Sequence, residues 1–151
     1  MKRFVGLVAA CLLLLGHGGV AAGDGIYFSD PNAAVTQKVS MAADTRAYRV
    51  DAARHFYDEY RSRIFRGRLP PLIHAVVVVE TTVDENGHAS RVDLVRGPTH
   101  APDVSAAVIQ AIRRAQLPKP TRFAGNVKFT EIWLVTRDGR FQLDALTEGQ
   151  N

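Results

Sequence analysis

The valine-rich run Ala75–Val83 constrains the fold of this chain more than any other segment. Its β-branched side chains favour a strand, in which alternate residues point to opposite faces of a sheet. One face carries three valines and a threonine: Val77, Val79, Thr81 and Val83. The opposite face begins with two valines and ends with polar residues: Val76, Val78, Glu80 and Thr82. Valine on both faces predicts a central strand that is covered on both sides in its first half.

A hairpin follows this strand. Asn86 and Gly87 separate it from Ser90–Arg96, the second strand pattern. An Asn-Gly pair between two strands indicates a tight turn whose two central residues adopt positive φ. We expect Val92 and Leu94 to point inward from the second strand.

A third strand is predicted over Val127–Thr136, with one largely apolar face: Phe129, Glu131, Trp133 and Val135. Asp138 and Gly139 then indicate another two-residue turn. This turn leads into a short fourth strand over Phe141–Leu143, which can pair back on the third strand.

Two helices complete the pattern. The first begins after Asp44 or Asp51, either of which could act as its cap, and it ends before Gly67. Its apolar stripe recurs at helical spacing: Ala52, Ala53, Phe56, Tyr57, Tyr60 and Ile64. The second is capped by Asp103 and ends before Pro118, with this stripe: Val104, Ala107, Val108, Ala111, Ile112 and Ala115.

The order of these elements predicts an α+β domain over residues 44–143: a small antiparallel sheet of three strands, with a short fourth, packed with two helices. A helix joins the second and third strands, and such a crossover links parallel strands. The valine strand therefore lies in the middle, antiparallel to both neighbours. The third strand lies at an edge unless the fourth strand covers it.

The N-terminus indicates export. A basic start is followed by the apolar run Phe4–Leu15 and by small residues up to Ala22, which is the order of a secretory signal peptide. We expect cleavage after Ala22 and a periplasmic mature chain; an uncleaved inner-membrane anchor is the alternative. Residues 23–43 are predicted to be a flexible lead-in, and residues 144–151 a polar tail. Cleavage would also remove Cys11, the only cysteine.

Charge argues against nucleic acid as a partner. The chain has 19 basic and 15 acidic residues, and removal of Lys2 and Arg3 with the signal peptide leaves 17 basic residues against 15. The densest basic cluster is Arg61, Arg63, Arg66 and Arg68. We interpret this cluster as the solvated end of the first helix. The alternative is contact with anionic lipid or an acidic partner.

No convergent set of catalytic groups is evident. His55 lies near Asp58 and Glu59, but a solvated helix face is the preferred interpretation of this triplet. The spacing of His74, His88 and His100 fits no metal-ligand pattern. The sequence has neither a phosphate-binding glycine loop nor a nucleophile elbow. We therefore expect neither an enzyme nor a metal or other cofactor.

The order of motifs resembles the C-terminal domain of the TonB family of energy transducers and, more loosely, TolA. The resemblance covers Tyr60 to Leu143. Its segments are Leu69–Pro71 after a helix, the valine strand, Val83–Gly87, Val92–Val95, the helix from Asp103 to Leu117–Pro120, and the aromatic strand Phe129–Val135. The resemblance implies an envelope protein of a Gram-negative bacterium that binds outer-membrane transporters.

In that family, a short peptide of the partner adds to the edge of the last long strand. This is β-augmentation, in which main-chain hydrogen bonds supply affinity. The matching residues here are Lys128, Thr130, Ile132, Leu134 and Thr136. A cleaved leader and a spacer of about 20 residues favour a soluble periplasmic relative over a complete transducer. An open edge would also permit a homodimer.

Overall fold

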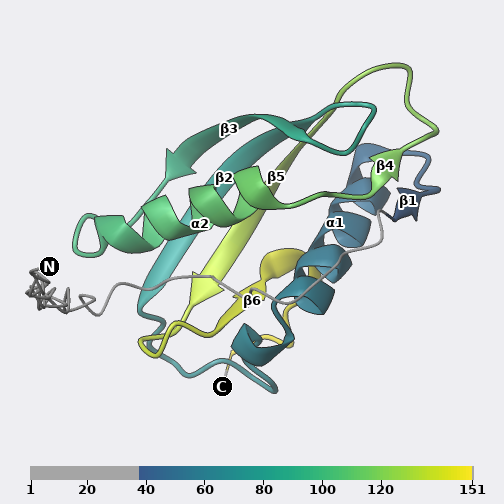
Figure 1. The fold of residues 1–151 in the computed structure, drawn as a ribbon. Coiled ribbons are helices and arrows are strands. Elements are labelled where there is room, and N and C mark those ends of the chain that lie inside the picture. Colours follow the sequence, from purple (N-terminus) through teal and green to yellow (C-terminus); the bar gives the residue numbers. More distant parts are fainter. Residues whose placement is uncertain (1–37, 151) are drawn as a thin grey trace, which may run out of the picture.

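Strand β2 (Ala75–Val83) is the centre of a four-stranded antiparallel sheet in the computed structural model, which describes residues 38–150 (Figure 1). The other strands are β3 (Ala89–Arg96), β5 (Val127–Val135) and β6 (Phe141–Leu143). The sheet order is β3-β2-β5-β6. The predicted α+β class, the central position of the valine strand and the short fourth strand are therefore confirmed.

The central strand is covered on one face only, so the prediction of cover on both faces is wrong. Val77, Val79 and Val83 are fully buried, whereas Val76 on the opposite face is 41% exposed. Val78 on that opposite face is half-buried. The second pair of valines reflects strand propensity rather than a second covering layer.

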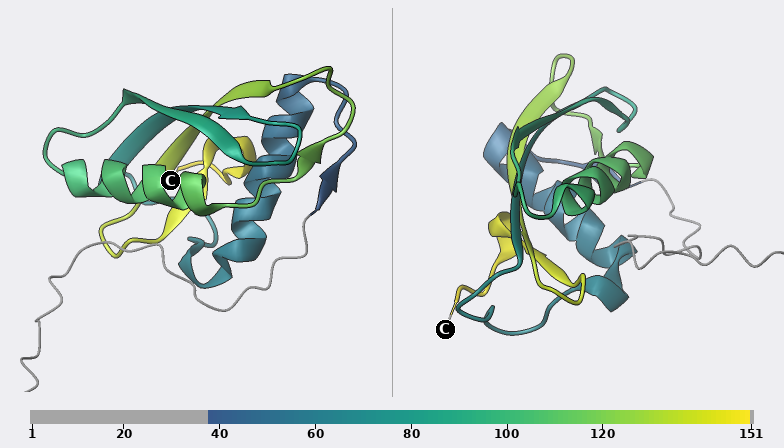
Figure 2. Two further views of the ribbon diagram at one scale, coloured as in Figure 1. Left: turned by 45° about the horizontal axis from the view of Figure 1, so that its top comes forward. Right: turned by 90° about the vertical axis from the view of Figure 1, so that its left-hand side faces the viewer.

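Both helices contribute to the core on the buried face. Helix α1 (Thr45–Glu59) packs against β5, and α2 (Pro102–Arg114) packs against β3 and β2 (Figure 2). The ring of Phe56 on α1 lies 5.1 Å from that of Trp133 on β5. Trp133 in turn lies 4.7 Å from Phe141 of β6. The Phe56–Trp133 pair is edge-to-face and the Trp133–Phe141 pair is tilted, and aromatic contacts of this kind stabilise the packing beyond their buried area.

The helix termini differ in part from expectation. The Asp44 side chain accepts a hydrogen bond from the Ala47 N–H, so Asp44 and not Asp51 is the cap of α1. This helix ends at Glu59, and a 3-10 turn (Arg61–Arg63) follows. Helix α2 has no side-chain cap; Pro102 occupies its first turn, where a missing N–H costs nothing. The prediction that Asp103 is the cap is wrong.

The β2–β3 turn has three loop residues instead of two. The Asp84 N–H donates to the His88 carbonyl, and the Gly87 N–H donates back to Asp84. Gly87 has φ of 83°, whereas Asn86 does not adopt positive φ. A type I turn closed by a left-handed glycine explains this pattern.

The end of the predicted flexible lead-in is folded. Strand β1 (Val39–Ser40) pairs in parallel with β4 (Lys119–Pro120). The Ser40 hydroxyl donates to Asp51 at 2.6 Å, and Lys38 forms an ion pair with Asp58. These contacts fix residues 38–40 against α1.

The C-terminal residues also pack on the domain, as part of a cover over β6. Phe65 N–H donates to the Phe141 carbonyl, and the Gln142 side-chain amide donates to the carbonyls of Phe65 and Gly67. Leu69 N–H donates to the Gly149 carbonyl. The predicted polar tail thus belongs to the domain up to residue 150.

The predicted signal peptide lies outside the described residues. Between residues 38 and 150, no helix has the length and apolar character needed to cross a membrane.

Candidate peptide-binding edge

The pairing of β5 determines the side of the strand toward which each residue points its backbone N–H and C=O groups. The Thr136 N–H donates to the Arg140 carbonyl at 2.8 Å, so the N–H and C=O groups of Thr136 point toward β6 and away from β2. Because polar groups of an antiparallel strand alternate between its two sides, Leu134, Ile132, Thr130 and Lys128 share this direction. These are the five residues for which the TonB resemblance implies partner binding, and their backbone groups lie on one edge.

Strand β6 occupies the C-terminal half of this edge. Strand β6 pairs with Trp133, Leu134 and Val135. In the turn after β5, the carbonyl of Arg140 accepts the hydrogen bond from the Thr136 N–H. Thr136 is also buried, and its hydroxyl bonds to Asp138 at 2.5 Å. Leu134 and Thr136 are therefore not available for strand addition in this structure.

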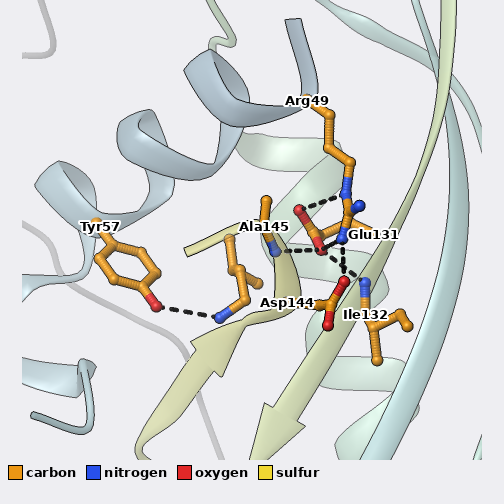
Figure 3. Close-up of polar contacts among 7 residues, drawn as sticks. Arg49, Tyr57, Glu131, Ile132, Asp144 and Ala145 are labelled. Carbon is orange, nitrogen blue, oxygen red and sulfur yellow. Dashed lines mark hydrogen bonds and ion pairs between the residues drawn. The ribbon is translucent and has the colours of Figure 1, made fainter. Parts of the chain in front are cut away.

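A carboxylate closes the edge at its midpoint (Figure 3). The Ile132 N–H donates to the Glu131 carboxylate at 2.9 Å, and the Ala145 N–H donates to the same oxygen at 3.3 Å. Arg49 on α1 forms a two-pronged contact with Glu131, at 2.7 and 3.1 Å, and reaches Asp144 at 2.7 Å. Ile132 is thereby excluded from the open part of the edge.

This cluster holds a charged group in a buried position. Glu131 is 3% exposed, and burial raises the pKa of its carboxyl, while Arg49 and the two backbone donors oppose that rise. Hydrogen bonding to Glu131 raises the pKa of the Arg49 guanidinium further above its ordinary value. Arg49 therefore stays protonated and compensates the buried carboxylate.

The Arg49–Glu131 contact was not foreseen. The sequence did place Glu131 on the inward face with Phe129 and Trp133, and a carboxylate among such residues requires a charged or hydrogen-bonding partner. That signal predicts some cation near Glu131. It does not identify Arg49, which lies 82 positions earlier in the chain.

Among residues 38–150, the half of β5 over Val127–Thr130 has a partner strand on one side only, namely β2. Lys128 and Thr130 are exposed, and the Lys128 ammonium contacts Glu80 at 2.7 Å across the outer sheet face. A hollow of about 260 Å³ lies close by, between α1 and the 3-10 turn Asp144–Leu146. Its lining residues are Arg46, Arg49, Val50, Asp144 and Ala145.

The four clustered arginines lie after α1, on the segment that also covers β6. Arg61 contacts Asp58 at 3.3 Å, and Asp58 also binds Lys38. Arg66 and Arg68 are exposed, while Arg63 is half-buried. The structure places these residues on one short segment, and contact with anionic lipid or an acidic partner stays a prediction.

Of the four histidines that the structure describes, only His74 and His100 lie beside each other. His55 is 2% exposed, so the interpretation of a solvated helix face is wrong for this residue; its Nε2 lies 3.3 Å from Glu59. It is among the residues that line the hollow between α1 and β1. His100 Nε2 is 2.8 Å from the His74 carbonyl. Within residues 38–150, no group of three or more metal-ligating side chains converges.

Comparison of the chain with protein-family models, with curated proteins and with solved structures found no match.

Proposed function

We propose that this chain is a periplasmic protein-binding module that takes an extended segment of an envelope protein as an additional strand on β5. The observation that carries this function is the open N-terminal half of β5. Lys128 and Thr130 each direct one N–H and one C=O group away from β2, and no strand among the described residues pairs there. Such groups are the template for β-augmentation.

The neighbouring surface adds side-chain selectivity to this main-chain template. The hollow beside α1 contains Arg46, for which no ion pair is found in the described part of the chain, as well as Arg49. A partner strand that continues past Thr130 toward Glu131 would bring its next side chain near these guanidinium groups. An acidic residue at that position of the partner suits them. The resemblance to TonB domains supports an outer-membrane transporter as the partner.

The binding test uses proline at position 130. Thr130→Pro removes the outward N–H but leaves the β2 ladder intact, because the N–H of Thr130 is not directed at β2. We expect the loss of one main-chain bond and steric hindrance to weaken partner binding by roughly tenfold. Thr130→Ala is the matched control, since it loses the same side chain and keeps the N–H.

The partner is identified by photo-crosslinking in intact cells. Crosslinkers at Lys128 and Thr130 should capture one envelope protein, whereas crosslinkers at Thr136 and at the exposed turn residue Glu85 should not. Equal capture at all four positions, or unchanged binding by the Thr130→Pro variant, would refute strand addition at this edge.

A further inference from the structure

The opposite edge of the sheet is also open. In the part of the chain that the structure describes, β3 pairs with β2 and with no other strand (Figure 1). A short bridge between His88 and Gln116 covers only the residue before β3. Leu94 and Val95 are 46% and 61% exposed, which places two large apolar side chains beside this edge.

The direction of the β3 backbone groups follows from the sheet register. Alternate residues of β2 bond to β5, so the residues between them, Glu80 and Thr82, bond to β3. Their partners on β3 are Asp93 and Arg91. Val92, which lies between these two partners, directs its N–H and C=O groups to the open side.

Two irregularities limit the length of this open edge. The register of β3 against β2 shifts between Ala89 and Arg91 and again between Leu94 and Arg96. Such bulges twist a strand away from regular pairing. Ser90 is the bulged residue of the first shift, so the regular part of the edge is the four residues from Arg91 to Leu94.

Within this part, the charges are self-complementary. Arg91 and Asp93 lie on the outer face of the sheet, two residues apart, and their side chains are 2.6 Å apart. Both are well exposed, with 74% and 42% of the side-chain surface accessible. A strand with Arg and Asp on either side of a central residue complements an antiparallel copy of itself.

We propose that β3 is a homodimer edge: two copies of this chain pair antiparallel through Arg91–Asp93, with a two-fold axis at Val92. In this register, Arg91 of each copy lies opposite Asp93 of the other, at positions where the backbones are not bonded and side chains approach most closely. Leu94 of each copy lies at the end of this pairing, beside the bulged Ser90 of the other copy, which covers part of the exposed Leu94 surface.

The charges select this register over its neighbours. A shift of the pairing by two residues places Arg91 opposite itself or Asp93 opposite itself, and like charges in those positions destabilise the pair. The two-fold contact uses both free β3 edges, so the assembly closes as a dimer instead of growing as a fibre. The eight strands form one sheet, and the two β5 edges remain at its outer ends. The dimer therefore does not depend on the function proposed for β5.

The experiment uses two charge-reversed forms of the full chain, Arg91→Asp and Asp93→Arg. Each variant alone places only like charges at the two-fold axis, so we expect its dimer dissociation constant to rise by about tenfold or more. An equimolar mixture restores both opposite-charge pairs and should dimerise as well as the original chain. Sedimentation velocity over a concentration series measures all four samples, and circular dichroism confirms that each variant is folded.

Disulfide trapping tests the register independently. In a Cys11→Ser background, a mixture of the Arg91→Cys and Asp93→Cys chains should give a covalent heterodimer, whereas neither chain alone should crosslink with itself. A monomeric original chain at every concentration, dimeric charge variants, or a mixture that stays monomeric would each overturn the proposal. Self-crosslinking of either cysteine variant alone would overturn the register.

Discussion

Replacing Glu131 by alanine should cost the domain about 3 kcal/mol of unfolding free energy. The carboxylate accepts four hydrogen bonds: two from Arg49, one from the Ile132 N–H and one from the Ala145 N–H. The two-pronged contact contributes about 2–3 kcal/mol and each backbone bond about 1 kcal/mol. Removal of a buried carboxylate returns about 1–2 kcal/mol of desolvation cost, which leaves about 3 kcal/mol.

Glu131→Gln is the matched control for this prediction. A glutamine oxygen can keep the bonds from Ile132, Ala145 and one Arg49 donor, but its amide group cannot accept from the second. Arg49 keeps Asp144 as an ion-pair partner and is 26% exposed, so loss of the negative charge is partly compensated. We expect a cost of about 1–1.5 kcal/mol.

Urea unfolding followed by far-ultraviolet circular dichroism measures both variants. A loss of 3 kcal/mol lowers the midpoint of a domain of this size by roughly 1.5–2 M urea. If Glu131→Ala costs less than about 1 kcal/mol, the carboxylate does not hold β5 to α1 and the C-terminal turn. If Glu131→Gln costs as much as Glu131→Ala, the charge and not the hydrogen-bond geometry dominates.

Two further changes test local geometry and pH dependence. Gly87→Ala should lower the unfolding free energy by more than about 3 kcal/mol, because Gly87 has positive φ and an added Cβ would lie 2.1 Å from the Leu117 carbonyl oxygen. Gly67→Ala is the control: it has the same backbone strain but open space around the Cβ, and it should cost about 1–2 kcal/mol. Equal losses of stability in thermal unfolding would exclude the clash with Leu117. Bonds from the Thr136 hydroxyl and a nearby arginine lower the pKa of Asp138 to about 2, so its stabilisation is present above about pH 4 and lost as pH falls through 2. Because Asp138 is 52% exposed, Asp138→Asn should cost less than about 1 kcal/mol at neutral pH, and this difference should vanish near pH 2.

The sheet was largely predictable because its signals are local. Alternation along Ala75–Val83 and Val127–Val135 fixes which residues face the core, and two turn signals join neighbouring strands. The crossover helix then leaves one simple strand order. The cover on one face of β2 was not predictable, since valine favours strands whether or not a layer packs on it.

The candidate edge was predictable in position but not in extent. The predicted strand order places Val127–Thr136 at an edge, and the resemblance to TonB domains gives Lys128 and Thr130 as residues of that edge. Closure of the same edge at Ile132 depends on contacts between residues distant in sequence, including Arg49 and the turn at Asp144. Likewise, β1 and β4 have two residues each, which is too short for a periodic signal.

Trp133 gives this fold a built-in optical reporter. It is the only tryptophan in the chain, has no exposed surface, and lies where α1, β5 and β6 meet. Its emission should therefore be at short wavelength in the native state and move to longer wavelength when β6 separates from β5. A fluorescence change that precedes the loss of helical signal during unfolding would mean that the C-terminal segment detaches first and extends the open edge of β5.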